Sequence, residues 1–153
     1  MPSSATFSHL TAHLGYWLRY VSNHVSHAFA LKLETRGVTV AEWVVLRELY
    51  NADPIAPSRL AEKLGMTRGA ITKLADRLIG KSLAARTADE DDGRAQTLAL
   101  TSAGCKLVPE LAALADENDA EFFGHLTPDE RLVMTRVLKD IVEKRGLQAA
   151  PIG

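Results

Sequence analysis

The chain has 153 residues, of which 46% are hydrophobic and 24% are charged, and its formal net charge is −1 at pH 7. These values fit one globular domain with a substantial core, and the near-neutral total argues against a protein that coats nucleic acid indiscriminately. The purely apolar runs are too short to cross a bilayer, and the first eighteen residues lack the Lys or Arg of a secretory signal. We therefore expect a cytoplasmic protein without membrane association, and its single cysteine, Cys105, fits a reducing compartment.

Three helices are predicted in the first 65 residues. Apolar residues at helical spacing predict a long first helix over residues 8–34. Thr39 is placed to cap a second helix, and a loop at residues 51–55 follows it. A short third helix is predicted to begin at Pro57, a favourable first-turn residue, and to stop at Gly65.

A fourth helix, a hairpin and two more helices follow. Thr67 is placed to cap the fourth helix, whose inward stripe is Ile71, Leu74, Ala75 and Leu78. Strand-length segments at residues 83–87 and 96–100 flank an acidic turn that contains glycine, which is typical of a β-hairpin. Thr101 is placed to cap a fifth helix, and Thr-Pro-Asp-Glu at 127–130 forms the capping box of a last one. This order predicts a mainly α fold with a small β-hairpin wing, the winged helix-turn-helix.

Charge is unevenly distributed along the chain. Residues 57–88 contain seven basic and two acidic residues, which gives this segment a net charge of +5 and leaves −6 for the rest. The sequence therefore predicts a basic stripe on an otherwise acidic body, and the local field rather than the total charge decides what approaches it.

The outward side of the fourth helix carries hydrogen-bonding and basic residues, as a helix seated in the DNA major groove requires. Arg68 can donate two hydrogen bonds to guanine and Thr72 can meet a base edge, so both are assigned to sequence readout. Basic residues further along this helix, and the start of the third helix, are assigned to phosphate. The candidate residues here are Ser58, Arg59, Thr67, Arg68, Gly69, Ala70, Thr72, Lys73 and Arg77. The alternative is an ordinary solvated helix face. Under that interpretation, the order of helix, helix and hairpin and the charge of the basic segment would be coincidental.

The tip of the predicted hairpin supplies two further candidates. Asp92 precedes Arg94 by two positions, so the carboxylate can hold the guanidinium in one pose for entry into a narrow minor groove. The alternative is a solvated turn with a surface ion pair of little energetic value.

Four segments carry a resemblance to a known family: Ser-Arg-Leu-Ala at 58–61, Thr-Arg-Gly-Ala-Ile-Thr at 67–72, Asp-Asp-Gly-Arg-Ala at 91–95 and Leu-Thr-Ser-Ala-Gly at 100–104. In these segments, and over nearly its whole length, the chain resembles the MarR family of bacterial winged-helix transcription regulators. The resemblance implies a homodimer joined through the first, fifth and sixth helices. It assigns residues 1–36 and 102–146 to dimerisation, 38–101 to the DNA-binding lobe, and 147–153 to a flexible tail.

The resemblance also implies a function. It predicts a regulator without a cofactor, most simply a repressor, that binds double-stranded DNA at a pseudo-palindromic operator and is released by a small aromatic or phenolic acid. Two residues depart from the family pattern: Ser82 replaces a usual glycine before the wing, and Gly93 replaces a frequent arginine. A left-handed backbone at Ser82 would cost roughly 1 kcal/mol that glycine avoids.

The predicted first helix carries a stripe of histidine and tyrosine. Successive members are three or four residues apart, which puts all six on one helical flank: His9, His13, Tyr16, Tyr20, His24 and His27. One interpretation is packing against the partner subunit or the fifth helix. A second is a cleft for an aromatic anion, lined by His13, Tyr16, Trp17, Tyr20, Trp43 and Arg47. A third is a metal site that uses His9 with His13, or His24 with His27, although no Cys or carboxylate lies near them.

The sequence carries no pattern of catalysis. It has no glycine-rich phosphate loop, no His-Glu-x-x-His and no paired cysteines, so we do not expect an enzyme. Cys105 has only Lys106 as a basic neighbour and is read as a packed helix residue rather than a thiol sensor. The remaining rival is a winged helix whose basic face meets an acidic protein.

Overall fold

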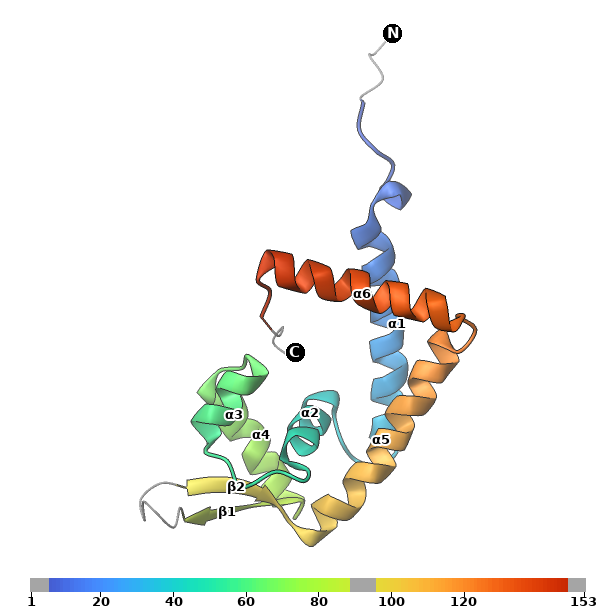
Figure 1. Ribbon diagram of the computed structural model, residues 1–153. Helices are drawn as coiled ribbons and strands as arrows, with labels where there is room; N and C mark the ends of the chain where they lie inside the picture. Colours follow the sequence, from blue (N-terminus) through green and yellow to red (C-terminus); the bar gives the residue numbers. More distant parts are fainter. Residues whose placement is uncertain (1–5, 89–95, 149–153) are drawn as a thin grey trace.

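The computed structural model describes residues 6–88 and 96–148, which form a winged lobe and a set of long helices (Figure 1). The elements in chain order are η1 (Leu10–Ala12), α1 (Leu14–Glu34), α2 (Val40–Leu49), α3 (Pro57–Leu64), α4 (Arg68–Gly80), β1 (Ala84–Ala88), β2 (Gln96–Leu100), α5 (Ser102–Phe123) and α6 (Pro128–Arg145). The mainly α fold with a two-stranded wing is confirmed, and no described helix is long and apolar enough to span a membrane.

The start of the first helix was predicted wrongly. Instead of one helix from residue 8, a single 3-10 turn is capped by His9, and His13 is extended at φ −93° before α1 begins at Leu14. In a continuous helix the Thr11 carbonyl would accept the amide of Gly15; here it accepts the Trp17 indole Nε1–H at 2.8 Å. His9 and His13 therefore lie outside α1 and do not share its flank with the tyrosines.

The predicted caps are confirmed. Thr39 and Thr127 each form a capping box with the glutamate three positions on, while Thr67 and Thr101 accept the amides of the residues three positions on. Gly65 ends α3 in the left-handed region at φ 64°, which costs glycine little. These caps fix the tight turn that brings α3 and α4 together.

The core of the lobe lies beneath α4, whose predicted inward stripe is fully buried. The strands pair antiparallel, with Ala84 opposite Leu100 and Ala88 opposite Gln96. Ile55, expected in a loop, instead exchanges two backbone hydrogen bonds with Leu98. This pairing attaches the segment before α3 to the wing.

The end of α4, the base of the wing and the start of α5 meet at one point. Ser82 is left-handed at φ 61°, as its place in the predicted pattern indicated, and its carbonyl accepts the Thr101 hydroxyl at 2.7 Å. A Cβ on Gly104 would overlap the carbonyl oxygen of Leu83, so glycine is needed where the first turn of α5 lies against the residue before β1.

The long helices leave much apolar surface uncovered. Asn118, nearly buried on α5, joins α1 to α5 by donating to the Val25 carbonyl at 3.1 Å and accepting from Lys32 Nζ at 3.1 Å. Within the described chain no residue of α6 is buried, and α1 buries only Leu33. The exposed large apolar residues on α1 and α6 include Leu14, Leu18, Val21, Leu132, Val137, Ile141 and Val142.

Candidate nucleic-acid interface

The amino end of α4 presents the predicted readout residues to solvent. Thr67 caps the helix through its hydroxyl oxygen, which accepts the Ala70 amide at 3.1 Å. Arg68, Gly69 and Thr72 on the first turns are exposed, and Ala70 is half-buried. The Thr72 hydroxyl donates to the Arg68 carbonyl at 2.9 Å, which leaves its methyl group and the two acceptor lone pairs of its oxygen for a base. The candidate readout residues therefore lie together on one exposed helix end.

Ion pairs divide the basic residues of this lobe into two groups. Lys63, Lys81 and Arg86 lie within 4.0 Å of the carboxylates of Glu48, Glu42 and Asp76, respectively. Among the described residues, no ion pair involves the other four basic residues of the segment, which are Arg59, Arg68, Lys73 and Arg77. These four are the same cations that the sequence assigned to DNA. Because no carboxylate among the described residues neutralises their charge, we expect them to be available to a polyanion.

The sequence missed the contact that joins the wing to α4. Arg86 on β1 donates to the Asp76 carboxylate at 2.7 Å, which offsets the only negative charge on the outward side of α4. Both residues were counted in the charge balance, but no periodic pattern in a sequence indicates an ion pair between a helix and a strand ten residues apart.

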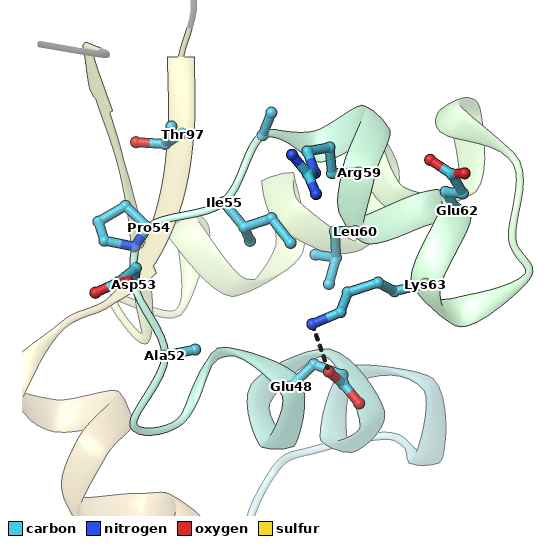
Figure 2. Close-up of a pocket in the computed structure, with 11 residues that line it drawn as sticks. Glu48, Ala52, Asp53, Pro54, Ile55, Arg59, Leu60, Glu62, Lys63 and Thr97 are labelled. Carbon is cyan, nitrogen blue, oxygen red and sulfur yellow. Dashed lines mark ion pairs between the residues drawn. The ribbon is translucent and has the colours of Figure 1, made fainter. Parts of the chain in front are cut away.

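The start of α3 lies beside an open hollow of about 770 Å³ (Figure 2). Arg59, Ile55 and Leu60 line it, and the Lys63–Glu48 pair lies across one side at 4.0 Å. Ser58 and Arg59 are exposed, so phosphate contact by both stays a prediction. Asp92 and Arg94, the predicted wing contacts, lie outside the described residues.

The predicted ligand residues fall into two separate groups. Tyr16, Trp17, Tyr20 and His24 form a ladder along α1, with Tyr20 stacked on His24 at 5.3 Å and Tyr16 edge-on to Trp17 at 5.1 Å. Trp43 meets Phe29 edge-on at 6.3 Å, and the Arg47 guanidinium lies 6.0 Å from the Tyr50 ring.

About 18 Å of helix separates Trp17 from Phe29, because each residue rises about 1.5 Å. Trp17 and the Phe29–Trp43 contact therefore lie at separate positions along α1. His13 lies before α1, and the described residues contain no group of three His, Cys, Asp or Glu side chains that could hold a metal.

A helix-turn-helix followed by a hairpin, with cations at the exposed end of its second helix that pair with no described carboxylate, defines a winged-helix DNA-binding protein. Residues 38–95 match the MarR family. The transcriptional repressor MdtR of Bacillus subtilis is 33% identical over 120 residues, which are 78% of this chain and 68% of that protein. The chain belongs to the MarR family of transcriptional regulators and is not an enzyme.

Solved structures agree with this assignment. The S. aureus MepR–DNA complex superposes with a TM-score of 0.78 at 25% identity, covering 86% of this chain and 98% of that one. CouR from Rhodococcus jostii RHA1, bound to p-coumaroyl-CoA, gives 0.75 at 26% identity, with 88% and 95% covered. Relatives of this fold thus include one structure with DNA and one with a small-molecule thioester.

Proposed function

We propose that the protein represses transcription by binding a pseudo-palindromic operator as a homodimer, and that a small aromatic or phenolic acid releases it. The observation that carries this proposal is the selective pairing of cations in the lobe. Structural ion pairs use Lys63, Lys81 and Arg86, while the cations on the outer side of α3 and α4 have no such partner among the described residues.

The exposed apolar surface of α1 and α6 supports a homodimer. Leu14 is 79% exposed and Leu132 is 66% exposed, and similar residues continue along both helices. Contiguous apolar surface of this kind marks an interface between proteins. A twofold dimer would present two copies of α4, and an operator with two half-sites would match that symmetry.

The aromatic ladder on α1 and the Trp43–Arg47 region support two candidate positions for an effector. Both offer aromatic surface, and the second adds an exposed guanidinium suited to a carboxylate. CouR was solved with an aromatic acyl thioester, which indicates that this fold accommodates such chemistry. Release requires that the effector bind more tightly to a dimer whose lobe spacing misfits the operator.

The test is selection of bound duplexes from a random pool, followed by titration with salicylate and benzoate as probes. We expect an inverted repeat whose half-sites lie about 34 Å apart, or one helical turn. Affinity should fall linearly with salt concentration on logarithmic axes. Enrichment of single half-sites, or a monomer in sedimentation at the concentrations used, would contradict the proposal. An unchanged affinity at saturating probe would contradict its effector part.

A further inference from the structure

The carboxyl end of α4 is held by an ion pair that joins a buried carboxylate to a partly exposed lysine, and the proposed DNA contacts do not use it. Glu42 on α2 is fully buried, although a carboxylate is rarely placed in a core. Lys81, the residue that follows α4, donates to both of its oxygens, at 2.9 Å to Oε1 and 2.8 Å to Oε2. The pair therefore has a bidentate geometry with little angular freedom.

A third bond extends this contact to α1. Lys81 Nζ also donates to the Gly37 carbonyl at 2.7 Å, in the turn that directly follows α1. An ammonium has three donors, and here each has an acceptor. Glu42 also accepts the Thr39 amide in the capping box of α2. One lysine thus ties the end of α4 to the start of α2 and the end of α1.

The same end of α4 is also tied to α5. The Thr101 hydroxyl donates to the Ser82 carbonyl at 2.7 Å, and the Thr101 amide donates to the Leu83 carbonyl at 3.1 Å. The junction therefore joins α4 to two of the three helices of the proposed dimer interface, α1 and α5. Apolar packing beneath α4 is non-directional and tolerates small rotations, whereas directed hydrogen bonds to a buried charge do not.

We propose that the Glu42–Lys81 pair is a positioning device that fixes the angle of α4 relative to α1, and so sets which half-site spacing the dimer accepts. The inference rests on the proposed operator binding as a homodimer. Each base pair inserted between half-sites rotates one against the other by about 34°. A small change in the angle of α4 therefore changes which operator fits.

The experiment measures affinity for duplexes whose half-site spacing is shortened or lengthened one base pair at a time. Lys81→Met keeps the aliphatic stem but leaves Glu42 without its cation. The double variant Glu42→Gln/Lys81→Met removes both charges, and so avoids a buried unpaired carboxylate and keeps the test valid if the single variant does not fold. Lys81→Arg retains a cation that can donate to both carboxylate oxygens. Lys63→Met is the matched control, because it removes one charge from an exposed pair in the same lobe.

Wild type, Lys81→Arg and Lys63→Met should each lose at least about tenfold in affinity, or about 1.4 kcal/mol, at the wrong spacing. The double variant should retain its base preference but bind neighbouring spacings within about threefold of one another, a difference of under about 0.7 kcal/mol. A folded double variant with the wild-type spacing profile would overturn the inference, whatever its melting temperature. If wild type itself shows no spacing preference, the proposed dimeric binding fails instead.

Discussion

Replacing Gly104 with alanine should loosen the wing from the long helices. A Cβ at this position would overlap the Leu83 carbonyl oxygen, and it would lie 3.2 Å from that carbonyl carbon and 3.3 Å from Leu100 Cβ. The obstacle is backbone, so no flexible side chain can move aside. Relief requires the Leu83 carbonyl to shift away from the Thr101 amide, which it now accepts at 3.1 Å.

The expected magnitude follows from three contributions. Overpacking costs typically about 1–3 kcal/mol. Loss of the Thr101–Leu83 hydrogen bond adds about 1 kcal/mol of destabilisation. The higher helix propensity of alanine offsets about 1 kcal/mol of it. We therefore expect Gly104→Ala to lower the free energy of unfolding by about 1–3 kcal/mol.

The assay is urea denaturation of wild type, Gly104→Ala and Gly80→Ala. Gly80 is the matched control, because it is also helical and a Cβ there meets nothing within 4 Å. Gly80→Ala should leave stability unchanged or raise it by up to about 1 kcal/mol. If Gly104→Ala unfolds at the same urea concentration as Gly80→Ala, the close approach of α5 to Leu83 does not limit the size of the residue at position 104.

Four further outcomes are expected. Lys73→Ala should reduce the slope of log affinity against log salt by about one unit, because one phosphate contact is lost. Arg68→Ala should relax preference at one base pair in each half-site, at a cost of about 1–3 kcal/mol per site, read by competition with substituted duplexes. Trp43→Ala should weaken the response to salicylate or benzoate in a binding assay while leaving DNA affinity intact. Glu42→Gln should destabilise the protein near neutral pH, with a difference from wild type that shrinks as the denaturation series is taken to acidic pH.

The pH dependence follows from the environment of Glu42. Burial alone would raise the pKa of this carboxyl, but hydrogen bonds from Lys81 and Thr39 outweigh it and hold the pKa below its ordinary value of 4.5. Because the pKa of Glu42 is lower in the folded state than in the unfolded state, its ionised carboxylate stabilises the fold at any pH above the unfolded-state pKa. This stabilisation is lost as the pH falls through the folded-state pKa. A difference between Glu42→Gln and wild type that stays constant down to pH 3 would contradict this assignment.

The other three predictions have equally direct contradictions. An unchanged salt slope for Lys73→Ala would remove that residue from the phosphate contacts. Uniform weakening on all duplexes by Arg68→Ala would assign Arg68 to the backbone rather than to a base. Simultaneous loss of DNA affinity and effector response in Trp43→Ala would indicate misfolding, since Trp43 packs against Phe29.

The sequence predicted features with local causes. A cap needs only a hydroxyl three residues before an amide, so Thr67 and Thr101 could be identified without any knowledge of the fold. The buried stripe of α4 follows from helical periodicity alone. Even the strained φ of Ser82 was indicated, because the family pattern places glycine there.

Features that depend on distant partners were not predictable in this way. Ile55 was assigned to a loop because Asp53 and Pro54 precede it, yet it pairs with Leu98, 43 residues later. Spacing alone predicts a first helix that begins at residue 8, since periodicity carries no sign that the Thr11 carbonyl accepts the Trp17 indole N–H. Lys81 and Arg86 contributed to the basic count of the segment, and only their geometry shows that carboxylates already neutralise them.

Because carboxylates neutralise some of these cations, the placement of charge on the lobe, and not its total, indicates DNA binding. A net charge of +5 over residues 57–88 would attract any polyanion, including the acidic partner of a protein-binding winged helix. Two of the seven cations, Lys81 and Arg86, instead link α4 to α2 and to β1, and Lys63 forms an exposed pair with Glu48, while Arg59, Arg68, Lys73 and Arg77 form no ion pair with a described residue. Phosphates and base edges repeat at fixed spacing along DNA, and a helix that rotates would no longer match them. A few cations that a rigid helix presents, and that no described carboxylate pairs, therefore suit DNA better than the variable surface of an acidic protein. We therefore expect the pairs that hold α4 in place to matter for DNA recognition as much as the residues proposed to touch it.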